Sequence, residues 1–337
     1  MKLSLIDLSP IPYGGSRAEA YQNTIETAQH IEQLGYHRIW LAEHHNSVQL
    51  AGRAPEVLIP TIASKTSKIR VGSGSVLLNH YSPYKVAEVF GSLEELFPGR
   101  IDLGIGRATT GPISDVALQR NRSFRQLTND SMEQLVELLT WFDQSFEPDH
   151  PFSKANVYRD APPPKAYLLG SSSWSAEAAG KVGLPYVFAS FINPKQTLQN
   201  KQLYEKNFRS SDFVQGIDKP HFIPSLSIYC MDNEPDALLF SAPVRMMMKR
   251  MRQGDVESPL LSEAEASAML QDDTRPAHRL ESPDVLPYHL TGSPEVLKEE
   301  IQLIKEFYNV DEIVIQMISA NHKRRMHSLE LLAEALL

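Results

Sequence analysis

The sequence predicts an α/β fold, a (β/α)8 TIM barrel with insertions, on two observations. The chain has 337 residues, a length that a single barrel with insertions fills. Short apolar runs alternate with segments of helical periodicity along nearly all of it. Eight such units favour a closed barrel of parallel strands, although a doubly wound open sheet would alternate in the same way.

The first unit shows the pattern most clearly. Residues 3–8 form a short apolar strand, and Ser16 can then cap a helix, with Glu19 three residues later as the partner of a capping box. Apolar residues recur at helical spacing from there until Gly35, which ends the helix. Residues 38–42 are the next strand.

The later units repeat this order. The remaining strands are expected at 69–71, 101–105, 166–169, 186–189, 222–229 and 312–316. Helices are expected near 55–65, 84–96, 129–146, 175–182, 194–209, 294–308 and 323–336.

Two long polar segments, 107–128 and 254–290, do not fit a minimal barrel. The second is acidic and contains prolines, with a short helix predicted at 262–270. Long excursions of this kind are either mobile lids over a site or surface insertions, and the sequence leaves both interpretations open for 254–290. No linker divides the chain, so residues 1–337 are expected to form a single domain.

Charge and composition exclude several classes of partner. The formal charge is −8, from 33 basic and 41 acidic residues, which disfavours nucleic acid because binding phosphates along a strand needs a basic surface. No run approaches the roughly 20 apolar residues of a membrane span. The N-terminus lacks a signal-peptide pattern, and a single cysteine suits a reducing compartment. We therefore expect a cytoplasmic protein without a membrane partner.

Small, hydroxyl and ionisable residues follow the predicted strands one after another. Barrel enzymes place their chemistry at these carboxyl ends. The groups concerned are Asp7-Leu8-Ser9, Glu43-His44-His45, Gly72-Ser73-Gly74-Ser75, Gly104-Ile105-Gly106-Arg107, Gly170-Ser171-Ser172-Ser173 and Ser190-Phe191-Ile192-Asn193.

The stretch from Gly170 to Ser175 runs from a strand into the first turn of a helix. Free backbone N–H groups there bind anions, and the hydroxyls of Ser172 and Ser175 are the ones we expect to reach a phosphate. The other interpretation is a helix merely capped by serine. Arg107 either pairs with the same phosphate or forms a salt bridge with a nearby carboxylate.

The two histidines after the second strand are not expected to bind one metal ion. Adjacent strand residues point to opposite sides, and neither HxH nor HExxH spacing is present. A metal-dependent barrel hydrolase is therefore disfavoured, and no metal site is predicted. His44 suits a general base or a hydrogen-bond donor, whereas His45 is expected to be a packed, satisfied side chain.

Several segments together resemble the bacterial luciferase-like flavin-dependent monooxygenases. They are LSLIDLSPI, RIWLAEHHN, IRVGSGSVLL, GSLEELFPGRIDLGIGRA, LLGSSSWSAEAAGKVGLPYVFAS, LTGSPEVLKEEI, VDEIVIQM and HSLELLAEAL. The resemblance spans nearly the whole chain, keeps the order of the motifs, and is nearest to an uncharacterised single-chain subgroup.

The resemblance implies roles for individual residues. His44 matches the active-site histidine beside the flavin ring. The cofactor positions are Leu8 and Ser9, which line the flavin, Gly74 and Ser75, joined by a non-proline cis peptide under the ring, and Arg107, Gly170, Ser171, Ser172 and Ser175 at or beside the phosphate. Light-emitting members have a reactive cysteine where this chain has Gly106 and a glutamate where it has Ser171, so a non-luminescent enzyme is expected.

The implied activity is an FMN-linked monooxygenase that uses reduced FMN and O2 to oxidise an aldehyde-like or other small organic substrate. The implied partners are a separate NAD(P)H–flavin reductase and a second copy of the chain in a homodimer. Two alternatives stay open: an oxidoreductase that transfers hydride with the deazaflavin F420, and a non-catalytic flavin-binding protein.

Overall fold

A computed structural model of the chain describes residues 1–107, 112–118, 130–157, 160–270 and 279–337. Eight parallel strands close into a barrel, because β10 pairs with both β1 and β8. In order around the barrel they are β1 (Lys2–Asp7), β2 (Arg38–Leu41), β3 (Arg70–Ser73), β5 (Ile101–Gly106), β6 (Lys165–Gly170), β7 (Tyr186–Ala189), β8 (Phe222–Cys230) and β10 (Glu312–Gln316). The predicted barrel and its eight strands are confirmed. Two short strands, β4 (Val76–Leu77) and β9 (Leu290–Gly292), add to β5 and β8.

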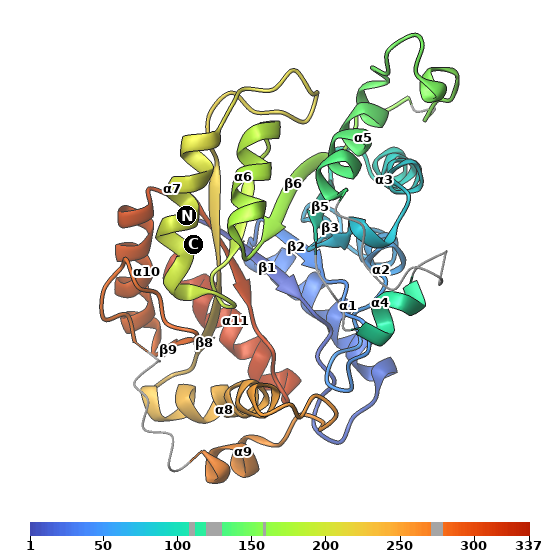
Figure 1. Ribbon diagram of the computed structural model, residues 1–337. Coiled ribbons are helices and arrows are strands. Elements are labelled where there is room, and N and C mark those ends of the chain that lie inside the picture. The colour runs from blue at the N-terminus through green and yellow to red at the C-terminus, as the bar shows by residue number, and fades with distance from the viewer. Residues whose placement is uncertain (108–111, 119–129, 158–159, 271–278) are drawn as a thin grey trace.

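Helices surround the strands (Figure 1). They are α1 (Arg17–Leu34), α2 (Pro55–Ala63), α3 (Pro83–Leu96), α4 (Pro112–Leu118), α5 (Ser131–Asp143), α6 (Ser173–Val182), α7 (Thr197–Asn207), α8 (Glu234–Arg252), α9 (Glu263–Met269), α10 (Pro294–Tyr308) and α11 (His322–Leu336). Short 3-10 turns, η1 (Leu78–His80), η2 (Pro151–Lys154) and η3 (Pro194–Gln196), lie between them.

Ser16 caps α1 and Gly35 ends it, as expected, but the structure shows only the Ser16 half of the predicted capping box. The Ser16 side chain accepts a hydrogen bond from the backbone N–H of Glu19 at 3.2 Å. Gly35 has a φ of 89°, a left-handed conformation that glycine adopts without steric cost, and so terminates the helix.

Helix α8 is the main element that the sequence did not reveal. It has 19 residues but begins with a proline in its first turn and contains Pro243, which disfavours a helix in any sequence-based prediction. The short helix predicted at 262–270 is present as α9. Residues 108–111, 119–129 and 271–278 of the two predicted excursions, with the expected helix start at 129, lie outside the described residues.

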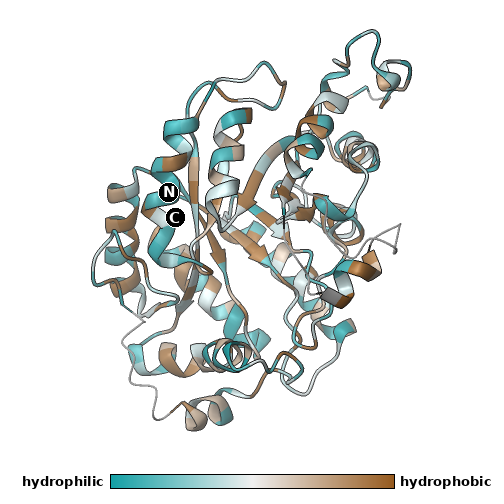
Figure 2. Ribbon diagram, viewed as in Figure 1, coloured by the Kyte–Doolittle hydropathy of each residue, from teal (hydrophilic) through white to brown (hydrophobic). Residues whose placement is uncertain are grey.

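Alternate strand residues enter two separate apolar clusters. Leu5, Ile39 and Ile315 belong to the large cluster between the strands and the helices. Their neighbours in the sequence, such as Ile6 and Trp40, point to the other side of the strands and form a small cluster inside the barrel. Figure 2 shows the same division, with apolar strands at the centre and hydrophilic residues on the outer faces of the helices.

A buried ion network closes the amino-terminal end of the barrel. Arg38 donates to Asp102 at 2.8 Å and lies 2.8 Å from Glu312, and both carboxylates are fully buried. Asp102 also accepts from Arg70 at 2.9 Å and from the Trp40 indole at 3.0 Å. Burial is the largest single influence on the pKa of Arg38 and would lower it, but Asp102, Tyr167 and Glu312 together raise this pKa above its ordinary value.

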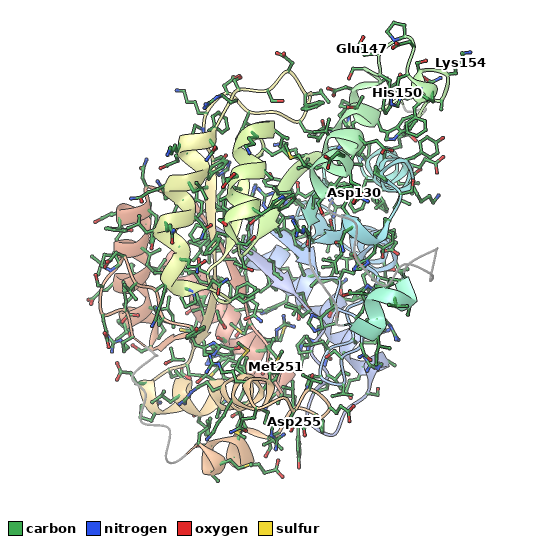
Figure 3. The ribbon with its side chains drawn as sticks, in the orientation of Figure 1. Asp130, Glu147, His150, Lys154, Met251 and Asp255 are labelled. Atoms are coloured by element: carbon green, nitrogen blue, oxygen red, sulfur yellow. The ribbon has the colours of Figure 1, made fainter. Side chains whose placement is uncertain are left out.

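Helices α8 and α9 lie at the opposite end of the barrel. The carboxyl end of β8 leads directly into α8, and α8 and α9 lie together at the bottom of Figure 1. Figure 3 shows Met251 and Asp255 at that end, while Glu147, His150 and Lys154 lie on the excursion between α5 and β6 at the other end of the molecule. No helix in the described part of the chain is long and apolar enough to cross a membrane.

The ion network predicts a large loss of stability on removal of one partner. Asp102→Ala should lower the free energy of unfolding by about 3–5 kcal/mol, because it leaves buried guanidinium groups uncompensated. Urea denaturation measures this, with Lys85→Ala at the exposed Lys85–Glu88 pair as the control, for which a change below about 1 kcal/mol is expected. Equal effects of the two substitutions would contradict the structural role assigned to the network.

Candidate functional site

The interior of the barrel changes from bulky and charged to small along its strands. On β2 the interior positions are Arg38, Trp40 and then Ala42, and on β5 they are Asp102 followed by glycines. The amino-terminal end is therefore filled by side chains, and the carboxyl-terminal end offers space. This is the end at which barrel enzymes bind their ligands.

His44 lies at this mouth, just beyond β2. Its backbone N–H donates to the Gly52 carbonyl at 2.9 Å, which fixes the loop that carries it. The imidazole is exposed at the mouth, yet burial by the surrounding protein, and secondly the neighbouring His45, lower its pKa. A neutral imidazole at neutral pH can both accept and donate a proton.

His45 is held by Glu43. Its Nε2 lies 2.7 Å from the buried Glu43 carboxylate. The same carboxylate accepts from Tyr81 at 2.7 Å and from the backbone N–H of Leu77 at 2.8 Å. The expectation that His45 is a packed, satisfied histidine is confirmed, and the Glu43 cluster anchors the loop of β2 to η1.

Gly74 and Ser75 are joined by a cis peptide bond, as the resemblance implies. A Cβ at position 74 would lie 2.8 Å from the Trp40 Cβ, and a Cβ at position 106 would lie 2.9 Å from the Ser75 Cβ. Both contacts are too short, so glycine is required at 74 and 106. The position at which light-emitting members carry a cysteine therefore has no room here for a side chain.

Arg107 and the serine loop meet at the first turn of α6. The Arg107 guanidinium lies over the Trp174 ring, 4.8 Å from its centroid, and no carboxylate in the described part of the chain is within ion-pair distance of it. Ser171 is half-buried and Ser172 is exposed. A free cation beside a helix N-terminus is an arrangement that binds anions.

Two of the expected site residues have hydroxyls that are already occupied. Ser175 is buried, donates to the Ser172 carbonyl at 2.7 Å and lies 3.0 Å from the Tyr186 hydroxyl. Ser9 is buried, with a φ of 50°, and its hydroxyl accepts from Thr24 at 2.9 Å. These two serines shape the backbone of the mouth, and Leu8 packs against the interior cluster below it.

Residues 254–270, the first described part of segment 254–290, contact the loops of β1 and β2. Gln49 donates to the Ser258 carbonyl, and the Tyr13 hydroxyl donates to Glu265 at 3.2 Å. Beside the second contact lies a cavity of about 610 Å³. Its lining includes Pro12, Tyr13, Asn23, Ser262, Glu263 and Lys323.

The structure adds residues that the sequence did not single out. Trp174 stacks on Arg107, and the Asn193 side chain donates to the Ser171 carbonyl at 2.6 Å. Asn193 follows β7, the sixth strand of the barrel, and the sequence pattern there assigned it no role. Among the described residues, no group of three His, Cys, Asp or Glu side chains is arranged to hold a metal ion.

A parallel barrel with its polar residues gathered at the carboxyl ends of the strands is the architecture of a barrel enzyme. The chain belongs to the luciferase-like monooxygenase family, whose model matches residues 1–307. This confirms the family expected from the sequence and places the chain among oxidoreductases.

The chain is similar over its whole length to members of this family. It is 34% identical to a luciferase-like monooxygenase of Escherichia coli strain K12, over 97% of this chain and 95% of that one. It is 33% identical to the N-acetyl-S-alkylcysteine monooxygenase of Bacillus subtilis strain 168, over 100% and 98%. The crystal structure of apo-MsnO8 matches with a TM-score of 0.87 at 36% identity, over 99% of this chain and 98% of that one.

The environment of His44 predicts a low titration midpoint. Its pKa lies below the ordinary value of 6.5, so the ring should be neutral at pH 7 and gain its proton only as the pH falls below 6.5. NMR titration of the ring resonances measures this. His45→Gln should move the midpoint upward but leave it below 6.5, because burial is the larger cause. A midpoint above 6.5 in the unmodified protein would contradict the prediction.

Proposed function

We propose that the protein is a flavin-dependent monooxygenase that uses reduced FMN and O2 to oxidise a small organic substrate without emitting light. The observation that carries the proposal is Arg107 stacked on Trp174 at the N-terminus of α6. This places a cation beside the first-turn backbone N–H groups of α6 at the mouth, as an anionic cofactor tail requires.

The residues at the mouth suit such a cofactor. Arg107, Ser171 and Ser172 would hold the phosphate. Gly74 and Gly106 keep the backbone of β3 and β5 free of side chains where a flat ring would rest. When bound, reduced FMN supplies the electrons that activate O2.

The chain's own residues would position the reactants and move a proton. His44, neutral at neutral pH, would exchange a proton with the substrate or cofactor at the mouth. Segment 254–290, tied to the loops of β1 and β2 by Gln49 and Tyr13, would act as a lid that keeps water out.

The proposal also names the partners and setting of the enzyme. A separate NAD(P)H–flavin reductase would supply reduced FMN, and the active form would be a cytoplasmic homodimer. Titration of the purified protein with FMN and with F420 tests the cofactor. Tighter binding of F420 would indicate that the cofactor is the deazaflavin and not FMN. Binding of FMN without substrate-dependent O2 consumption would indicate a non-catalytic flavin-binding protein.

Arg107→Ala should weaken FMN binding about 10- to 100-fold, the effect of losing a charge-assisted hydrogen bond. Fluorescence titration measures the dissociation constant. Lys154→Ala is the matched control, because it removes one positive charge at the far end of the molecule (Figure 3) and should leave the affinity unchanged. The same loss in both variants would point to a general charge effect and contradict a phosphate site at Arg107.

His44→Ala should retain FMN affinity while turnover falls about 10²–10⁴-fold, the range for loss of a general acid or base. Oxygen consumption with an added flavin reductase and a screened substrate measures turnover. His150→Ala, on the excursion far from the mouth, is the control (Figure 3). Near-normal turnover of His44→Ala would remove this histidine from the reaction.

A further inference from the structure

The mouth of the barrel has two halves. Most residues proposed for the cofactor follow strands that are consecutive around the barrel, β2, β3, β5 and β6, and the expected flavin-lining residues Leu8 and Ser9 follow the adjacent β1. Strands β7, β8 and β10 complete the circle. A ligand bound on the cofactor half therefore leaves the opposite wall, centred on β8 and β10, open to a second ligand.

This opposite wall is polar at its carboxyl end. Ile223 of β8 and Val314 of β10 lie in the interior cluster, so the two-residue repeat of a strand turns Ser225, Ser227 and Gln316 to the same side. We refer to these three residues as the β8–β10 wall.

The strand register puts the β8–β10 wall at the mouth. Ser225 pairs with Ala189, the last residue of β7. Ser227 pairs with Gln316, the last residue of β10. The polar side chains therefore lie level with the strand ends, above the apolar interior cluster.

Two members of the wall make no side-chain hydrogen bond to the described residues, and the Ser225 hydroxyl is a buried polar atom without a partner. The Ser225 side chain is fully buried, and its hydroxyl has no hydrogen-bond partner in the described part of the chain. Gln316 is 4% exposed, and its amide makes no hydrogen bond to the described residues. Buried polar groups are almost always paired, so such groups facing a ligand-binding end indicate a missing polar partner.

Ser227 is held in place by a residue from elsewhere in the chain. The His289 imidazole, which precedes β9, lies with its Nδ1 3.0 Å from the Ser227 hydroxyl, and both side chains are buried. This contact fixes the outer edge of the wall. Ser225 and Gln316 are then the polar side chains of the wall that are available to bind a ligand.

The two strands of the wall carry no cation. Strand β8 contains no acidic or basic residue, and the single one on β10, Glu312, is paired with Arg38 at the far end of the barrel. These strands therefore offer no lysine or arginine to a free carboxylate or phosphate. The serine hydroxyl and the glutamine amide each both donate and accept, which matches a neutral group that does the same.

We infer that the β8–β10 wall is the substrate-binding side of the mouth, and that Ser225 and Gln316 recognise a neutral carboxamide through its C=O and N–H. The inference rests on the proposed function, because it assigns the organic substrate to the half that the flavin leaves open. Both side chains act as specificity-determining groups and take no part in proton transfer.

The test compares two probes of nearly equal shape. N-butylacetamide offers a C=O and an N–H, whereas butyl acetate offers no N–H. Their dissociation constants are measured by ligand-observed NMR on the FMN-loaded protein and on the protein without FMN. The amide should bind about tenfold more tightly than the ester, the effect of one additional hydrogen bond to a buried group.

Gln316→Met and Ser225→Ala should remove this preference, so that both probes bind within about twofold of each other. Gln29→Met, the same substitution on the exposed face of α1, should retain it. Thermal melts of the variants supply a second readout. A purely structural role would lower Tm, whereas replacing an unpartnered buried polar group by an apolar one should leave Tm unchanged or raise it.

The outcomes separate the inference from the proposed function. Equal binding of the two probes to the unmodified protein, including no detectable binding of either, overturns the inference even if FMN binds. A preference for the amide that survives in Gln316→Met and Ser225→Ala also overturns it. An amide preference in a protein that binds no FMN would support amide recognition by the β8–β10 wall and would refute the flavin-dependent function.

Discussion

The buried ion network of Arg38, Asp102 and Glu312 is the constraint on which the rest of the barrel depends. It joins β2, β5 and β10 across the interior, with all its charges removed from water. Such charges are tolerated only when each is paired, so the three strands are held in one register. Because the network fills the amino-terminal end and Trp40 and Tyr167 pack above it, the interior has room for a ligand only at the carboxyl-terminal end.

The order of strands and helices was readable from the sequence because it depends on local periodicity. Each of the eight strands is a short apolar run, and α10 begins at Pro294 and ends at Tyr308 where the pattern predicts. Helix α8 was not readable, because Pro243 lies inside it and its packing against α9 overrides the local preference. Tertiary contacts of this kind leave no periodic trace in the sequence.

The site was predictable where it depends on backbone and on single exposed charges. The cis peptide at Gly74–Ser75 was expected from the family resemblance. The packing of His45 against Glu43 and the meeting of Arg107 with the serine loop follow from strand ends and their spacing. The engagement of Ser175 with Ser172 and Tyr186 was not predictable, because it depends on which way one hydroxyl rotates in the first turn of α6. The β8–β10 wall was not predictable for another reason. Only the register of β8 against β10 and β7 shows that Ser225 and Gln316 reach the mouth.

The two halves of the mouth differ in charge, and this difference can sort two ligands within one opening. An anionic tail is attracted to Arg107 and the N-terminus of α6, and β8 and β10 offer it no cation. A neutral polar molecule gains little from Arg107 but can satisfy the buried groups of the opposite wall, whose lack of partners is costly until it binds. Under the proposed function, each ligand is therefore disfavoured in the other's place. The specificity of the mouth then depends on the contacts that each half makes and equally on the groups that each half lacks.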